Sequence, residues 1–193
     1  AFRYSEDALQ SFKSIRFPGH RDSISLRHLY TPRAILKHNV MRSVSGAGNE
    51  TIVETSLESR SQPSEELNLL NSQKNLLIFG KAGSGKSTLL RYMGLLALDG
   101  KVKQSRIPLL VSVANHLHEP GSLMQVLQDE FSRIDSTSTG DFATFLKKGK
   151  ILLLLDDIDV LSTEQLSAVL RDIDELSQTY PDTQVVMCCR GDL

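Results

Sequence analysis

The sequence predicts a three-layer α/β domain with a mostly parallel β-sheet. Three observations support this fold class: a glycine-rich loop between an apolar run and a helix-like run, a continuous apolar strand that ends in aspartate, and further apolar runs that alternate with helical patterns. The chain has 193 residues, which is enough for a single hydrophobic core.

The glycine-rich loop reads GKAGSGKST and has the G-x-x-x-x-G-K-S spacing of a Walker A phosphate-binding loop. Glycines at 80, 83 and 85 permit backbone conformations that turn N–H groups toward phosphate oxygens, and the following helix points its positive end at them. We expect Lys86 to reach the β- and γ-phosphates and Ser87 to ligate Mg²⁺. A glycine-rich turn before an ordinary helix is the alternative, and the strand–loop–helix context disfavours it. The predicted nucleotide-binding residues are Gly80, Lys81, Ala82, Gly83, Ser84, Gly85, Lys86, Ser87 and Thr88.

Composition excludes several classes of protein. The net charge of -1 gives no general attraction to nucleic acid or to an anionic membrane. No apolar run approaches the ~18 residues of a membrane span, and no apolar leader is visible. Cys188 and Cys189 are neighbours in a predicted strand, so they point to opposite faces and do not pair. This favours a reducing compartment, and we predict a cytoplasmic protein.

The part before the loop is predicted in two segments. Residues 1–40 would precede the core or pack on it: apolar residues around Phe12 have helical spacing, partial alternation predicts an extended segment up to Tyr30, and Pro32 excludes a central strand. Residues 41–64 are rich in Ser, Gly, Asn and Glu, which predicts a flexible loop.

Residues 65–193 are predicted to form the core. In order, the predicted elements are a capped helix over 65–70, a strand over 76–79, a helix from the loop to about 98, a strand over 107–113, helices from about 123 and over 142–146, a strand over 151–155, a helix over 163–176 and a strand over 184–189.

The run ILLLLD at 151–156 is apolar throughout, which is typical of a parallel strand that is buried on both faces. Open α/β sheets bind ligands at the carboxyl ends of their strands. Asp156 is therefore the Walker B candidate for holding Mg²⁺; an acid that merely ends the strand is the alternative.

Two further charged residues follow strands. Asp159 is a candidate to orient or activate the attacking water, or else a helix N-cap, although Ser162 with Gln165 is better placed to cap the next helix. Arg190 follows the last strand, where a cation would face the γ-phosphate; a surface arginine is the alternative.

The order of these segments resembles the NACHT branch of the STAND class of P-loop NTPases, especially its bacterial members. The resemblance is carried by residues 77–91, 107–113, 145–159 and 180–190, the last of which looks like the sensor 1 strand. The segment Tyr30, Thr31, Pro32 and Arg33 looks like the pre-loop segment that passes the adenine in this class.

The chain departs from the family pattern. Asp157 stands where a small residue is usual, and Val160 stands where a second acid usually follows Asp159, which puts hydrolysis in doubt more than binding. The chain ends just after the sensor 1 strand, so we expect a fragment whose core is truncated there. The class has the strand order 5-1-4-3-2, and loss of the fifth strand predicts that the strand at 76–80 is an exposed edge.

The resemblance and the motifs together predict an ATP-binding switch that uses Mg²⁺ and hydrolyses ATP slowly or conditionally. ATP is preferred over GTP because no N-K-x-D motif is present. The resemblance further implies self-association of the whole protein and a sensor role, with bacterial defence as one context. A non-hydrolysing assembly scaffold stays open as an alternative. A P-loop small-molecule kinase is disfavoured because no arginine-rich lid is found.

Overall fold

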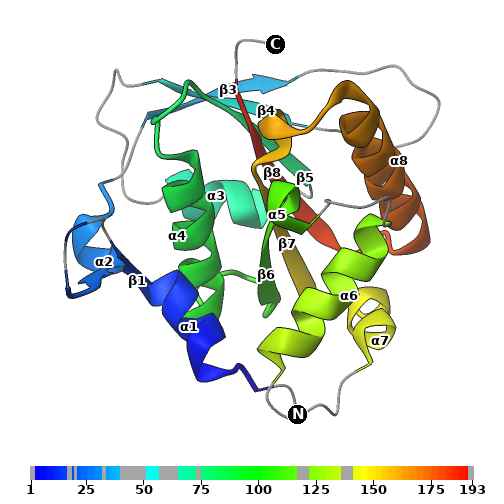
Figure 1. Cartoon of the computed structure of the whole chain (residues 1–193), viewed down its shortest axis with the longest axis horizontal. Helices are drawn as coiled ribbons and strands as arrows, with labels where there is room; N and C mark the ends of the chain where they lie inside the picture. The colour runs from blue at the N-terminus through cyan, green and yellow to red at the C-terminus, as the bar shows by residue number, and fades with distance from the viewer. Residues whose placement is uncertain are drawn as a thin grey trace.

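The computed structural model describes residues 3–16, 19, 21–31, 34–39, 51–56, 65–72, 75–116, 122–135 and 141–190. A six-stranded sheet runs through the molecule in the order β3-β4-β5-β8-β7-β6 (Figure 1). The strands are β3 (Ala34–Asn39), β4 (Thr51–Ser56), β5 (Asn75–Phe79), β6 (Ile107–Ser112), β7 (Ile151–Asp156) and β8 (Gln184–Cys189). From β4 to β6 all neighbours are parallel, and β3 pairs antiparallel with β4.

Helices cover both faces of this sheet, which gives three layers (Figure 1). One face carries α1 (Glu6–Lys13), α3 (Glu65–Ser72) and α4 (Lys86–Leu98). The other face carries α6 (Leu123–Ile134), α7 (Phe142–Lys147) and α8 (Thr163–Thr179). The predicted α/β three-layer fold is confirmed, and so are the predicted helices and strands of the core, except that the strand from Ile107 ends at Ser112 and Val113 begins α5 (Val113–His116). The predicted cap of α3 lies outside the described residues.

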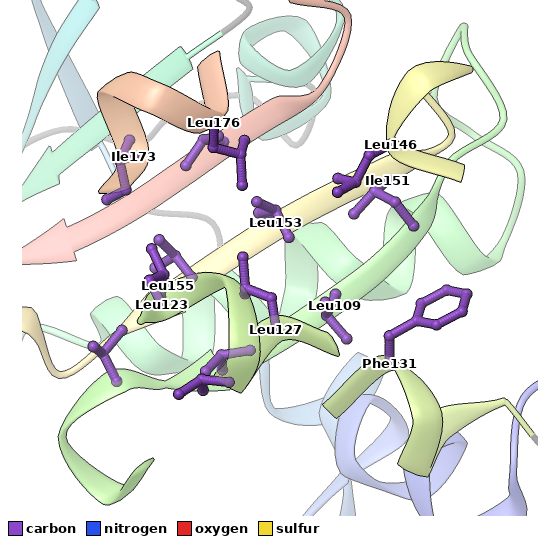
Figure 2. Close-up of a cluster of buried hydrophobic side chains, with 14 of the residues drawn as sticks. Leu109, Leu123, Leu127, Phe131, Leu146, Ile151, Leu153, Leu155, Ile173 and Leu176 are labelled. Carbon is purple, nitrogen blue, oxygen red and sulfur yellow. The ribbon is translucent and has the colours of Figure 1, made fainter. Parts of the chain in front are cut away.

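The central strand β7 shows why its sequence is apolar throughout. Leu153 and Leu155 face the cluster beneath α6 and α8, whereas Leu152 and Leu154 face the cluster beneath α4. Figure 2 shows the first cluster, in which Leu153 lies among side chains from β6, α6, α7 and α8. A strand that is buried on both faces has no polar position until its end, where Asp156 is only partly buried.

The exposed-edge prediction for the loop strand is wrong. Strand β4 pairs in parallel with β5, from Thr51 opposite Leu76 to Glu54 opposite Phe79. β4 lies within the predicted flexible loop, so that prediction is also wrong for Thr51–Ser56; the rest of 41–64 lies outside the described residues. Thr, Ile and Val dominate β4, and such β-branched residues favour strands even in a polar setting.

The N-terminal segment packs against the core. The Tyr4 hydroxyl donates to the Pro108 carbonyl (2.9 Å), the Ser5 amide donates to the Ile134 carbonyl (2.8 Å), and Phe12 is buried beneath α4. β1 (Ser14–Ile15) and β2 (Ile24–Ser25) form a small antiparallel pair. The extended prediction is wrong for α2 (Leu26–Leu29), because one helical turn buries Leu26 completely. The domain boundaries at 40 and 64 stay predictions.

Among the described residues, no helix is both long and apolar enough to cross a membrane.

A tight turn before β7 gives a stability prediction. Gly149 has φ +59°, and a Cβ there would lie 2.7 Å from Asp182 Cβ and 2.9 Å from the Asp182 carbonyl oxygen. Gly149→Ala is therefore expected to lower the free energy of unfolding by about 2–4 kcal/mol, from the left-handed backbone and the backbone clash together. Urea denaturation measures this change.

Gly100→Ala is the matched control, because Gly100 has φ +66° and open space where the Cβ would lie. It is expected to cost only about 1–2 kcal/mol, the strain of the backbone alone. Equal costs for the two variants would show that the turn at Gly149 moves freely away from Asp182.

Candidate functional site

The glycine-rich loop connects β5 to α4 at the carboxyl end of the sheet. Gly83 and Gly85 have φ values of +71° and +84°, and Gly85 is the N-cap of α4, which begins at Lys86. The predicted need for glycine is confirmed at these two positions. For Gly80 it is wrong: this residue has no positive φ, and its amide donates to the Cys189 carbonyl (3.2 Å).

The side chains of the loop are arranged for an anion. The Lys86 ammonium lies over the loop and donates to the carbonyls of Gly80 (2.7 Å) and Lys81 (3.1 Å). The Ser84 hydroxyl is buried and has no hydrogen-bond partner. A buried hydroxyl without a partner is unfavourable, and a phosphate oxygen would satisfy it. The loop therefore fits a phosphate group.

Ser87, in the first turn of α4, and Asp156, at the end of β7, meet at the end of the sheet, although β8 lies between β7 and the strand that leads into the loop, β5. Burial raises the pKa of Asp156, and the nearby Asp157 carboxylate raises it further, whereas hydrogen bonding from Ser87 and from the Asp157 amide lowers it. A hydroxyl and a carboxylate are hard oxygen ligands, and Mg²⁺ at phosphate sites takes only one or two protein ligands. A divalent cation there would offset the unfavourable burial of Asp156, so the pair fits Mg²⁺.

Asp157 follows with φ +59°, in the left-handed region. Its carboxylate accepts from the Ser112 hydroxyl (2.6 Å), and its amide donates to Asp156 Oδ1 (3.0 Å). Asp is among the few residues with a Cβ that tolerate this conformation, since its short side chain bonds locally. A left-handed backbone favours a small residue, because a Cβ is strained there. In this chain the hydrogen bond from Ser112 holds the Asp157 carboxylate in place.

Asp159 and Arg190 form an ion pair, with Arg190 Nε 2.6 Å from Asp159 Oδ2. Asp159 lies in the short helix η1 (Ile158–Val160), and Arg190 follows β8, the strand between the loop strand and the Asp156 strand. Asp159 is not the N-cap of α8, because Ser162 and Gln165 form a capping box there. The alternative of a helix cap is thus excluded for Asp159.

On the adenine side, the described part of the predicted segment is Tyr30 and Thr31; Pro32 and Arg33 lie outside the described residues. The Tyr30 ring stacks on Tyr92 of α4, with ring centroids 3.8 Å apart, and its hydroxyl donates to the buried Glu66 carboxylate. Tyr30 therefore packs on the second turn of the helix that begins at Lys86.

Three residues near these positions were not predicted from the sequence: Ser112, Glu66 and Tyr92. Only Ser112 carried a usable signal, a polar residue at the carboxyl end of a predicted parallel strand. Glu66 and Tyr92 lie on helices, and the apolar patterns of these helices do not predict a contact with Tyr30.

The cysteines are structural. Cys188 is completely buried, with its thiol 3.9 Å from the Lys86 carbonyl. Burial raises the pKa of Cys189 to about 11, so its reactive thiolate is scarce at neutral pH.

Comparison with known families gives one match, which contains the loop, Asp156, Asp159 and Arg190. The model of the NACHT domain matches residues 74–191, more than half of the 193-residue chain. No curated protein and no solved structure matches the chain. With the fold and the loop described above, the match shows that the chain belongs to the NACHT domain family, within the STAND class of P-loop NTPases.

Proposed function

We propose that this NACHT domain binds ATP and ADP with Mg²⁺ and hydrolyses ATP slowly, as a switch. Membership of the family makes the chain a nucleotide-binding NTPase switch domain. The observation that carries the finer proposal is the convergence of Lys86, the unpartnered Ser84 hydroxyl and the Ser87–Asp156 pair at one end of the sheet.

The phosphates would lie in the loop formed by residues 80–88. Backbone N–H groups of the loop, which turns through positive φ at Gly83 and Gly85, and the N-terminus of α4 would supply fixed positive dipoles there. Lys86 would exchange its bonds to loop carbonyls for bonds to the β- and γ-phosphates. Ser87 and Asp156 would hold Mg²⁺, which neutralises charge on the transferred phosphate when it is bound.

Asp159 and Arg190 are the residues proposed to act on the γ-phosphate side. Asp159 would orient the attacking water, and Arg190 would contact the γ-phosphate. Slow hydrolysis is proposed because Val160, which is 57% exposed, supplies no second acid. The switch would then depend on which nucleotide is bound.

For the base, we propose adenine, with Tyr30, Thr31, Pro32 and Arg33 on its side of the site. The whole chain lacks an N-K-x-D motif, which reads guanine in other P-loop NTPases. By family analogy, we extend the proposal to self-association and sensing by the whole protein, with bacterial defence signalling as one context.

A non-hydrolysing scaffold is the second candidate function. The observation that favours it is again Val160, where the expected acid is replaced by a side chain that cannot accept a proton. Nucleotide would then stabilise an assembly without turnover.

Calorimetric titration with Mg²⁺ and ATP, ADP or GTP tests the proposal. ATP and ADP are expected to bind, and GTP at least about tenfold more weakly. Equal binding of GTP would contradict the adenine assignment, and no binding by the folded domain would contradict the proposed function.

Single-turnover phosphate release then separates the two candidates. Slow release that is lost in Asp156→Ala supports the hydrolysing switch. Release no faster than in Asp156→Ala, with nucleotide binding intact, supports the scaffold.

A further inference from the structure

The Asp159–Arg190 ion pair uses only part of the guanidinium. Arg190 Nε is the atom that lies 2.6 Å from Asp159 Oδ2. Among the described residues, Asp159 is the only ion-pair partner of Arg190. Within the described part of the chain, the two terminal Nη groups of the guanidinium have no ion-pair partner, and the Arg190 side chain is half exposed, at 50%.

The position of the pair relative to the loop is fixed by backbone contacts. Arg190 directly follows Cys189, whose carbonyl accepts from the Gly80 amide at the start of the loop (3.2 Å). Strand β8 lies between β5 and β7, so its end lies between the loop and Asp156. The Asp159 side chain is only 10% exposed, so the packing around it restricts its position and that of the guanidinium bound to it.

We infer that Asp159 is a positioning residue for Arg190, and that this ion pair sets the preference of the site for ATP over ADP. The inference deepens the proposed function and rests on it. Asp159 holds the guanidinium through Nε and leaves both Nη groups for the γ-phosphate, a fork that suits phosphate oxygens. ADP has no γ-phosphate, so its affinity does not depend on the pair.

Two physical effects of removing Asp159 have opposite signs, which makes the inference testable. A free arginine side chain must lose rotamer freedom when it binds, so loss of its anchor weakens ATP binding. Loss of a negative charge near the γ-phosphate strengthens ATP binding instead. The measured direction decides which effect dominates, and positioning predicts weaker binding.

The experiment is calorimetric titration with Mg²⁺ and either a non-hydrolysable ATP analogue or ADP. Asp159→Ala is expected to weaken binding of the ATP analogue by about two- to fivefold, the range for a partly exposed ion pair, and to leave ADP affinity unchanged. Arg190→Ala is expected to weaken the analogue by about tenfold and not ADP. In the Arg190→Ala background, Asp159→Ala is expected to have no further effect.

Asp157→Asn is the matched control, because it removes the same charge from a carboxylate that is paired with Ser112 and not with an arginine. Its ratio of ATP-analogue to ADP affinity is expected to stay the same or rise. Asp159→Asn retains an acceptor for Nε and is expected to fall between wild type and Asp159→Ala.

Unchanged or tighter binding of the ATP analogue by Asp159→Ala, with ADP affinity intact, would overturn the positioning role and leave the proposed function standing. Loss of ADP binding in Asp159→Ala would also overturn it, since the role would then be structural. Absence of all nucleotide binding in the folded wild-type domain would overturn the proposed function and this inference together.

Discussion

Lys86→Ala is expected to weaken the binding of ATP by at least about a hundredfold and that of ADP by at least about tenfold. The Lys86 ammonium is held over the loop by the carbonyls of Gly80 and Lys81, at the position proposed for the phosphates. A hydrogen bond to a charged group contributes about 1.5–3 kcal/mol, so bonds to both the β- and the γ-phosphate account for a hundredfold or more in ATP, and the one bond to the β-phosphate for about tenfold or more in ADP. Calorimetric titration measures the loss for each nucleotide.

The fold is expected to survive this substitution. Lys86 is partly buried, and its removal frees the carbonyl of the exposed Lys81 and that of the buried Gly80. We therefore expect the free energy of unfolding to fall by about 1–3 kcal/mol, the cost of a buried acceptor left without its donor. Thermal unfolding of the variant without nucleotide checks this. If Lys86→Ala unfolds, the titration is repeated with Lys86→Met, which removes the charge but keeps most of the aliphatic stem.

Lys101→Ala is the control for charge alone. Lys101 is exposed and follows α4 at the end of the helix opposite the loop. The substitution therefore removes one positive charge without changing a residue of the site. It is expected to change either affinity by less than about twofold, because solvent screens charges at that distance. A comparable loss in Lys101→Ala and Lys86→Ala would contradict a specific role for Lys86.

Local patterns were enough to predict the core of the fold. β7 was predictable because burial on both faces excludes polar residues from it, and α8 because Ser162 and Gln165 form a capping box before an apolar stripe. The meeting of Ser87 and Asp156 was also predictable, since the carboxyl ends of parallel strands lie at one edge of a sheet.

The elements that were missed depend on contacts distant in sequence. β4 lies in a polar stretch of the sequence, and its pairing with β3 and β5 makes it a strand. Glu66 is placed at the start of a helix, where exposure is the usual expectation, but it is completely buried, and the Tyr30 hydroxyl donates to it. Asp159 follows β7 in η1, and Arg190 follows β8. The two residues are distant in sequence, and the pattern around either residue does not predict their ion pair.

Phe12→Ala is expected to lower the free energy of unfolding by about 3–5 kcal/mol, the usual cost of removing a buried aromatic ring. Phe12 is 2% exposed and packs beneath α4 in the cluster that includes Leu90, Met93 and Leu154. Urea denaturation measures the loss. A cost below about 1 kcal/mol would show that the N-terminal segment is not part of the core.

Gly94 explains how the ring approaches the helix so closely. A Cβ at Gly94 would lie 2.2 Å from Phe12 Cε1, 2.5 Å from Phe12 Cδ1 and 3.1 Å from Leu154 Cδ1. Gly94→Ala alone is therefore expected to destabilise the domain by about 1–3 kcal/mol, because the ring must shift. Alanine nevertheless favours a helix over glycine by about 1 kcal/mol when nothing obstructs it.

The two substitutions together give the sharper test, since the sign of one depends on the other. In the Phe12→Ala background the ring is gone, and Gly94→Ala is expected to stabilise the domain by up to about 1 kcal/mol. This change of sign would establish direct packing of α1 on the helix that begins at the phosphate-binding loop. Equal effects of Gly94→Ala in both backgrounds would mean that Phe12 and Gly94 do not touch in solution, and α1 would then have to be placed elsewhere.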